Sequence, residues 1–423
     1  MFPTVSNNSR RCGLRASFAC SLLVCGGVLF THSGNTAGMT EQQASFQIYT
    51  LDTGSGTVAA DVSPDGRFVA IDAVKGSVVP MGIEEVEEMQ IWSFRDRKLV
   101  ANKKLAQQTY AKTSDIPTDY DRGFVRYTSS GSELVVYWKG RFAPKGRLLV
   151  FDSTTLDELQ NIDLGMSSWP RLPPSVSNFH SLVIDVQVDE RGGRAAILLE
   201  WGVYGGGELR VYELTSGALL RKWDFQGVGF GRMSIDPQGQ RIAIPVLPFV
   251  VGARRLRANE RNLRILDVDS GKTVSEINTG YIAAADAFIG QDRVASVSAN
   301  PDVKHFDKDT IKIWDVETGR LIRQISSEPG GVHDTLLVSD GGRVALGYVG
   351  LDKHVGPWWM IERNNVTVYR RFRLWNLGTD EVLATSPDLP SLVGSAFALS
   401  ARGDVVLVYP VARGGALHFY EVR

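Results

Sequence analysis

Cysteine is almost absent from this sequence. The 423 residues contain three cysteines, Cys12, Cys20 and Cys25, and all of them lie near the N-terminus. Because the rest of the chain has no cysteine, it cannot form disulfides, use a catalytic thiol, ligate an iron–sulfur cluster or attach haem covalently. Histidine is also sparse, with six residues and no HxH or HExxH spacing that would indicate a metal site. No nucleophile-elbow pattern indicates a serine hydrolase.

An excess of charge of either sign is lacking as well. Lys and Arg total 46, Asp and Glu total 47, and the formal net charge at pH 7 is −1. This balance provides no basic stripe for nucleic acid, and we expect no nucleic-acid partner. Long helical patterns are also missing, because Gly or Pro interrupts every apolar i, i+3, i+4 series. The sequence therefore predicts an all-β protein.

The first forty positions contain no Asp, Glu or Lys. Arg10, Arg11 and Arg15 precede an apolar run from Ala16 to Phe30, which is the layout of an export signal. We expect residues 1–37 to be this signal and residues 38–423 to form one periplasmic or secreted domain. The arginine pair resembles the twin-arginine motif, although Gly13 replaces a large apolar residue, so the general secretion route stays open.

Other fates of this segment are also open. Cleavage can follow Ser33 or Ala37, and Cys25 can be lipidated. An uncleaved segment would anchor the protein in a membrane, but its about 15 apolar residues are fewer than the ~20 that span a bilayer. We expect no stable membrane insertion once the signal is removed.

A strand-turn-strand sequence motif occurs seven times. Its third strand carries an aromatic or aliphatic residue, and these residues lie 59, 61, 54, 48, 61 and 45 positions apart: Trp92, Phe151, Tyr212, Leu266, Trp314, Trp375 and Tyr420. Each copy opens with a strand that runs into a tight turn such as Ser63–Gly66, where glycine accepts the positive φ of a hairpin. Repeats of this length predict four-stranded blades, and seven copies predict a seven-bladed β-propeller.

The last copy ends after its third strand. An unassigned strand, residues 45–50, precedes the first copy. We expect this N-terminal strand to complete the final blade and close the ring, because closure removes exposed strand edges.

The segments Ile313–Gly319 and Ser63–Gly66 resemble the WD-repeat family of β-propellers, and the resemblance covers residues 45–423. The family's Gly-His opening has one similar segment, Gly331–His333, and the connections between second and third strands are longer than the family's. The resemblance implies the fold and names no partner.

Long segments between the second and third strands are expected to build one elaborated rim: Lys75–Met89, Lys139–Gly146, Gly202–Gly207, Pro248–Asn262, Asn300–Asp309, Gly350–Arg370 and Pro410–Gly415. Two connections between blades, Gln107–Asp121 and Gly165–Asn178, add to it. Loops on a rigid scaffold are common binding sites. This rim is expected to hold an acidic cluster, Glu84, Glu85, Glu87 and Glu88, and a basic one, Arg254, Arg255, Arg257 and Arg261.

The consecutive Trp358 and Trp359 suggest an exposed aromatic anchor. We therefore expect partner binding through Trp358, Trp359, Arg363, Arg254, Arg255 and Arg257, with the protein acting as a protein- or peptide-binding scaffold without a cofactor. The alternative interpretations without a binding role are that the loop charges are simply solvated and that both tryptophans are buried. The oligomeric state is not specified by the sequence.

The alternative function is an enzyme at the central channel, either a metal-dependent hydrolase or a quinone-linked dehydrogenase. Asp61, Asp185, Asp286 and Asp334 lie on the expected innermost strands and can supply metal-binding oxygens. They do not share one position relative to their turns, so a polar channel lining is the competing interpretation. Gly227–Gly231 resembles a phosphate loop but precedes a strand, and we expect it to be a connection between blades.

Overall fold

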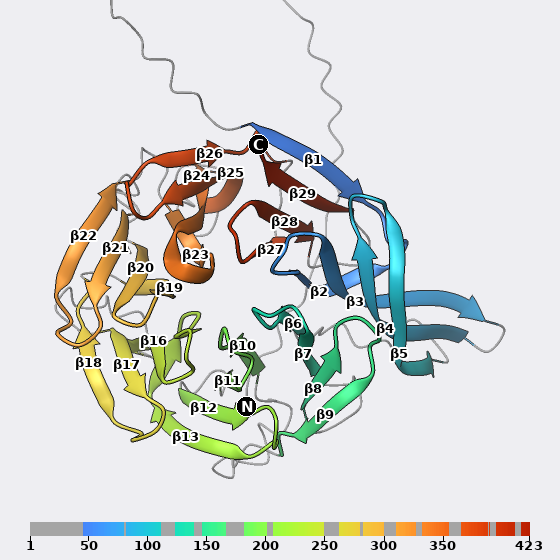
Figure 1. Ribbon diagram of the computed structural model, residues 1–423, viewed down its shortest axis with the longest axis horizontal. Helices are drawn as coiled ribbons and strands as arrows, with labels where there is room; N and C mark the ends of the chain where they lie inside the picture. Colours follow the sequence, from blue (N-terminus) through green and yellow to red (C-terminus); the bar gives the residue numbers. More distant parts are fainter. Residues whose placement is uncertain are drawn as a thin grey trace, which may run out of the picture. The chain divides into compact units, whose positions relative to one another are not determined.

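Seven antiparallel sheets form a ring in the computed structural model (Figure 1), as the sequence predicts. The structure describes residues 45–79, 82–110, 123–138, 146–165, 182–200, 206–248, 262–279, 282–299, 310–326, 332–354, 365–387, 389, 395–410 and 416–423.

The blades follow one another along the chain, and each uses its first strand on the inside of the ring (Figure 1). Blade 1 contains β2 (Gly56–Val62), β3 (Phe68–Val79), β4 (Gly82–Ser93) and β5 (Lys98–Tyr110). Blade 2 contains β6 (Phe124–Tyr127), β7 (Glu133–Trp138), β8 (Arg147–Asp152) and β9 (Glu158–Asp163). Blade 3 contains β10 (Leu182–Val188), β11 (Arg194–Glu200), β12 (Gly206–Glu213) and β13 (Leu219–Gln226).

In blade 4 the first strand is divided into β14 (Val228–Phe230) and β15 (Ser234–Ile235), which both pair with β16 (Arg241–Pro248) and are followed by β17 (Leu263–Asp267) and β18 (Thr273–Ile277). Blade 5 contains β19 (Ile282–Ile289), β20 (Arg293–Ala299), β21 (Thr310–Asp315) and β22 (Leu321–Ser326). Blade 6 contains β23 (Val332–Val338), β24 (Val344–His354), β25 (Asn365–Asn376) and β26 (Val382–Thr385), with a short 3₁₀ turn, Asp340–Gly342, after β23.

Blade 7 closes the ring with strands from both ends of the described chain. It contains β27 (Ser395–Leu399), β28 (Val405–Pro410) and β29 (Leu417–Val422), and β1 (Phe46–Leu51) is its outer strand. β1 pairs antiparallel with β29, with Ile48 opposite Tyr420. The Phe46 ring lies edge-on to Phe372 of blade 6 at 5.4 Å between centroids. The predicted closure is therefore confirmed.

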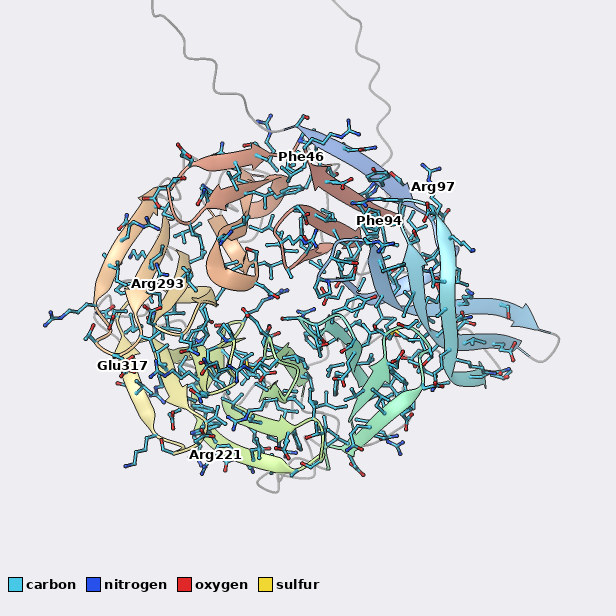
Figure 2. The ribbon with its side chains drawn as sticks, in the orientation of Figure 1. Phe46, Phe94, Arg97, Arg221, Arg293 and Glu317 are labelled. Atoms are coloured by element: carbon cyan, nitrogen blue, oxygen red, sulfur yellow. The ribbon has the colours of Figure 1, made fainter. Side chains whose placement is uncertain are left out.

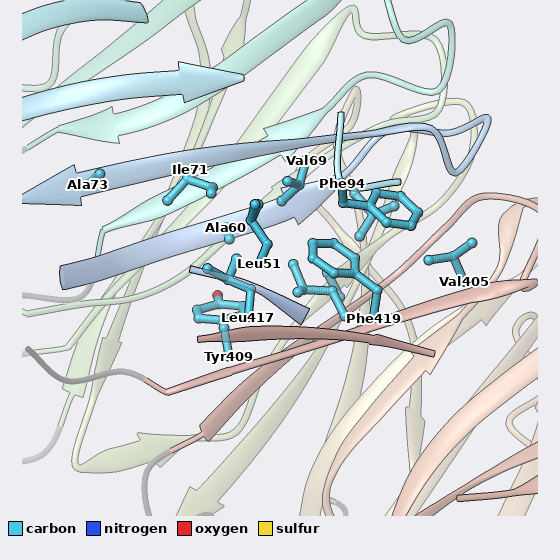
Figure 3. Packing of buried hydrophobic residues seen from close by; sticks show 13 residues of the cluster. Leu51, Ala60, Val69, Ile71, Ala73, Phe94, Val405, Tyr409, Leu417 and Phe419 are labelled. Carbon is cyan, nitrogen blue, oxygen red and sulfur yellow. The ribbon is translucent and has the colours of Figure 1, made fainter. Parts of the chain in front are cut away.

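Each interface between neighbouring blades has its own hydrophobic core. Seven clusters of buried side chains correspond one to one with the seven interfaces. At the closure, Phe94 of blade 1 stacks on Phe419 of blade 7 with 4.2 Å between ring centroids (Figure 3). Alternating strand side chains supply these cores because successive residues point to opposite neighbours. The ring is therefore held by apolar packing all the way round.

The tight turns also contact the neighbouring blade. Gly66 has φ +66° in the β2–β3 turn, and a Cβ added there would lie 2.9 Å from Val405 Cγ2 of blade 7. At the outer side of the ring, Arg221 Nε donates to Val268 O at 2.9 Å, and Arg241 pairs with Glu317 (Figure 2). These contacts connect each outer turn with the blade that precedes it.

Several predicted loops are strands. The segment Lys75–Met89 was expected to be a loop, but β3 extends to Val79 and β4 begins at Gly82. The segment Gly350–Arg370 likewise continues β24 to His354 and contains β25 from Asn365. Gly227–Gly231, expected to be a connection, contains β14. In each case cross-strand pairing extends the ladder over residues whose local pattern indicated a loop.

Candidate functional site: the central channel

The expected binding residues of the rim lie outside the described residues. This holds for Trp358, Trp359, Arg363, Arg254, Arg255 and Arg257. The expected acidic cluster is described, and it does not form one patch. Glu85 and Glu87 share the face of β4 with Met89, which packs toward blade 2, whereas Glu84 and Glu88 lie on the opposite face. Glu88 is neutralised by Lys75 at 2.8 Å.

The channel aspartates come from the innermost strands, as expected. Asp61 lies on β2, Asp185 on β10, Asp286 on β19 and Asp334 on β23. For Asp334 only the backbone is described. The two glycine-ended turns that follow Asp61 and Asp185 place them at different heights along the channel. These aspartates therefore come from blades 1, 3, 5 and 6, and Asp61 and Asp185 do not belong to one ring of carboxylates at a single level.

Two of these aspartates bind the backbone of the next blade. Asp61 Oδ2 accepts a hydrogen bond from Tyr127 N at 2.8 Å, and Asp185 Oδ2 accepts one from Met233 N at 3.0 Å. The donor in each case is the residue that follows an arginine, Arg126 or Arg232. These carboxylates therefore link blade 1 to blade 2 and blade 3 to blade 4.

The two links have the same internal geometry. The first hairpin of each blade is closed by the N–H of Ser63, Thr128, Asp189 or Asp236 in blades 1 to 4. Asp61 and Arg126 both lie two residues before their closing residue, and Asp185 and Arg232 both lie four residues before theirs. Asp61 is thus at the height of Arg126 in the next blade, and Asp185 is at the height of Arg232. The first two residues lie at a different level of the channel from the second two.

Burial sets the electrostatics of these groups. It raises the pKa of Asp61 to about 6, while the positive charge of Arg126 and the Tyr127 N–H oppose that rise. It also raises the pKa of Asp185, against the charges of Arg232 and Arg126 and the hydrogen bonds from Gln187 and Met233. Asp61 therefore titrates near neutral pH.

Asp286 is more deeply enclosed. Its side chain is 3% exposed, and Ser234 Oγ donates to Oδ2 at 2.7 Å from blade 4. Within the described residues Oδ1 has no hydrogen bond. Burial raises the pKa of this carboxyl well above its usual range, and the charge of Asp185 raises it further. Burial therefore favours the protonated form of Asp286, whose hydrogen bond with Ser234 joins blades 4 and 5.

Two further carboxyls, the buried Asp72 and the half-buried Glu87, lie between blades 1 and 2. Asp72 on β3 is 1% exposed, and burial followed by the charge of Glu87 on β4 raises its pKa well above the usual range. A Cβ added to Gly123 would lie 2.8 Å from Asp72 Oδ2, so this glycine permits the close approach. Burial raises the pKa of Glu87, and the nearby Trp138 Nε1 opposes that rise, although Nε1 makes no well-formed hydrogen bond within the described residues.

A shallow groove of about 480 Å³ lies beside the tight turns of blade 1. Its cations are partly neutralised, because Arg95 pairs with Glu421 of blade 7. Asp96, which accepts a hydrogen bond from Ser93 Oγ at 2.6 Å, also lines it. The charged side chains that line the groove are therefore three cations, Arg67, Arg95 and Lys98, and one carboxylate, Asp96.

The channel arginines were missed by the sequence analysis. Arg126 lies on β6 and Arg232 lies between β14 and β15, and both are half-buried. A signal was present, because Arg126 stands at the position that Asp61 occupies relative to the turn of its own copy. A comparison of equivalent positions between copies, instead of a search for aspartate alone, would have found the pair.

The described residues contain no group of three or more His, Cys, Asp and Glu side chains that could hold a metal ion. They also contain no helix long and apolar enough to span a membrane. No family model matches this chain, and the search of curated proteins found no significant match.

Proposed function

We propose that this protein is an exported, WD-repeat-like propeller that binds a protein or peptide partner through the rim that carries its second-to-third-strand connections. The export proposal comes from the first 37 residues of the sequence, with their arginines and apolar run. The family proposal comes from the repeated third-strand and turn segments. Periplasmic or secreted localisation follows from the export signal.

The observation that carries the proposal is the difference between the two rims. First-to-second and third-to-fourth strand turns share one rim, and they are short, as Gly66 of the β2–β3 turn and Gly319 of the β21–β22 turn illustrate. In an antiparallel blade the second-to-third connections emerge at the opposite rim. We therefore infer that the longer connections gather at that rim, which is where binding residues concentrate on a rigid scaffold.

Blade 1 also extends this rim with a described sheet. β3, β4 and β5 have 12, 12 and 13 residues, whereas β7, β8 and β9 of blade 2 have six each. The tips of β3 and β4 project beyond the ring (Figure 1). Gln107 of β5 donates to Glu84 of β4, so side chains as well as backbone hold the extension together. A projecting sheet provides both an edge and a face for a partner.

Affinity capture from the native envelope fraction tests this function. One variant replaces Gly76–Glu85 by Asn-Gly, which leaves Lys75 paired with Val86 and shortens the extension. A control variant changes the exposed Arg191 in a turn on the opposite rim to Ala. We expect a stoichiometric partner with the wild type and the control, and weaker capture with the shortened variant. Capture of no partner by the wild type would refute the scaffold function.

A further inference from the structure

The groove beside the tight turns of blade 1 contains one row of residues that crosses three strands. Phe68 of β3 lies opposite Ser93 of β4, and Ser93 lies opposite Lys98 of β5. Directly opposed residues point to the same face of a sheet, so these three residues form a continuous row about 10 Å long. Phe68 packs against the core between blades 1 and 2. The row therefore lies on the face of blade 1 that is directed toward blade 2.

Two cations stand at the two ends of this row. The Arg67 guanidinium lies over the Phe68 ring, 5.5 Å from its centroid, and Lys98 is the last residue of the row. Both residues are exposed, and in the described part of the chain neither forms an ion pair with a carboxylate. One carboxylate, Asp96, lines the groove, and Ser93 Oγ donates to it at 2.6 Å. The row therefore carries more positive than negative charge.

The remaining charges of these turns are directed to other partners. Arg95, the third cation of the groove, pairs with Glu421 of blade 7. Asp65 Oδ1 accepts the backbone N–H of Arg67 at 3.0 Å. Arg67 and Lys98 are therefore the two cations of the groove that can receive an anionic ligand.

The groove lies where other blades carry an arginine that bridges to the next blade. Phe68 corresponds to Arg194 of blade 3 and Arg241 of blade 4, because each lies opposite the last residue of the third strand. Arg194 pairs with Asp269 of blade 4 at 3.0 Å, and Arg241 pairs with Glu317 of blade 5. A phenylalanine cannot form this ion pair. Blade 1 therefore presents an aromatic surface with a neighbouring cation where blades 3 and 4 have an internal salt bridge.

An unusual backbone conformation adds a further charge beside the row. Arg97 has φ +54°, whereas the equivalent turn position is Gly217, Gly271 or Gly319 in blades 3, 4 and 5. A left-handed conformation costs a residue with a side chain more conformational energy than it costs glycine, and such strain is concentrated at functional sites. Arg97 is exposed and lies at the outer side of the ring (Figure 2).

We propose that this groove binds an acidic peptide segment that carries an apolar side chain between two carboxylates. Arg67 and Lys98 pair with the carboxylates, and Phe68 and Val100 supply the apolar lining. In an extended peptide, residues four apart lie on one side at a distance of about 13 Å, and the long Arg, Lys and Glu side chains cover the difference from the length of the row.

A peptide is favoured over a free small anion because each exposed ion pair is weak by itself. A ligand that forms two such pairs and an apolar contact gains from all three at once. The groove lies beside the tight turns, away from the rim with the second-to-third-strand connections. The proposal therefore does not depend on the proposed scaffold function of that rim.

Titration calorimetry measures the binding with three probes: the peptide Ac-Glu-Ser-Leu-Ser-Glu-NH2, its uncharged match Ac-Gln-Ser-Leu-Ser-Gln-NH2, and inorganic phosphate. The variants are Arg67→Met and Lys98→Met, which keep an apolar stem. The matched control is Lys272→Met, because Lys272 is exposed and occupies in the β17–β18 turn the place of Lys98. We expect saturable binding of the acidic peptide to the wild type and the control, and at least about 5-fold weaker binding to each groove variant. Added sodium chloride should weaken the binding.

Thermal unfolding of every variant checks the fold, and both groove variants should melt as the wild type does because they change exposed residues. The proposal is overturned if the acidic peptide does not saturate the wild type at about 5 mM. Equal binding of the glutamine peptide, or equal affinity of both folded groove variants and the wild type, also overturns it. An equal loss in Lys272→Met would assign the binding to general surface charge and overturn it. Binding of phosphate without binding of the peptide would assign the groove to a small oxyanion and reject the peptide.

Discussion

Asp61 and Asp185 show how a single side chain links two blades. Each carboxylate accepts a backbone N–H from the following blade, and each is placed at the height of that blade's arginine. The metal-site hypothesis required these oxygens to converge on one point. Their hydrogen bonds direct them instead toward separate interfaces, which favours the polar-lining interpretation for the side chains described.

The titration of Asp61 gives a pH-dependent stability. Its pKa is about 6 in the folded protein and near 3.8 in an exposed aspartate, so the folded state holds the proton over this window. Stability therefore decreases as the pH rises from about 4 to about 7. Asp61→Asn keeps an acceptor for Tyr127 N but cannot ionise. Urea unfolding should show a smaller loss of stability between pH 4.5 and 7.5 in the variant than in the wild type; equal slopes would contradict the assignment.

Trp314 tests the apolar core at the same scale. It is 6% exposed, packs in the core between blades 4 and 5, and donates from Nε1 to Ser296 Oγ at 2.9 Å. Trp314→Ala should cost about 3–5 kcal/mol, because it leaves a cavity and an unpaired buried hydroxyl. Denaturant unfolding measures the cost.

The matched control for Trp314 is its cross-strand neighbour Leu321, which is 47% exposed. Leu321→Ala should change the stability by less than about 0.5 kcal/mol. A near-neutral effect of Trp314→Ala would contradict the assigned packing of the fifth blade.

At the scale of the element, β1 is the strand that closes the ring. Its six residues pair with β29, and they come from the opposite end of the described chain. Without β1, β29 would present unpaired N–H and C=O groups and the rings of Phe419 and Tyr420 would lose cover. Closure of the ring therefore depends on the pairing of β1 with β29, which come from the two ends of the described chain.

Deletion of residues 45–51 should lower the melting temperature and promote aggregation, because β29 becomes an exposed edge. Size-exclusion chromatography and a thermal melt measure both effects. Within β1, Phe46→Ala should destabilise, since Phe46 packs on Phe372 and Tyr420. Ile48→Ala should be tolerated, since Ile48 is 50% exposed. A soluble deletion variant with an unchanged melting temperature would show that closure does not depend on β1.

The elements that the sequence predicted well are those with local signals. Turns such as Ser63–Gly66 require a positive φ, and the third strands repeat an aromatic position, so blade number and closure were predictable. The β3–β4 extension was missed because Lys75–Met89 was interpreted as a long connection between strands, whereas pairing across strands decided the structure. The Asp–Arg pairs were missed because each joins two blades, and no local pattern records that contact.

On the scale of the whole domain, the ring separates three surfaces with different chemistry. Tight turns cover one rim, the ends of the second strands and the extension of blade 1 lie at the other, and polar side chains from blades 1 to 5 line much of the channel. Apolar cores at every blade interface hold the scaffold together, so substitutions at the rim should change its stability little. Binding and stability can therefore be changed separately.

That separation predicts how the rim residues should behave. The double variant Trp358→Ala and Trp359→Ala should weaken partner capture and leave the melting temperature nearly unchanged, because aromatic anchors concentrate interface energy while the blade cores hold the fold. Arg254→Glu with Arg255→Glu should instead slow association, most strongly at low salt where electrostatic steering is least screened. Surface plasmon resonance with the captured partner, at low and at physiological ionic strength, distinguishes the two effects. If both variants bind the partner as the wild type does, the binding surface is the turn-covered rim or the channel.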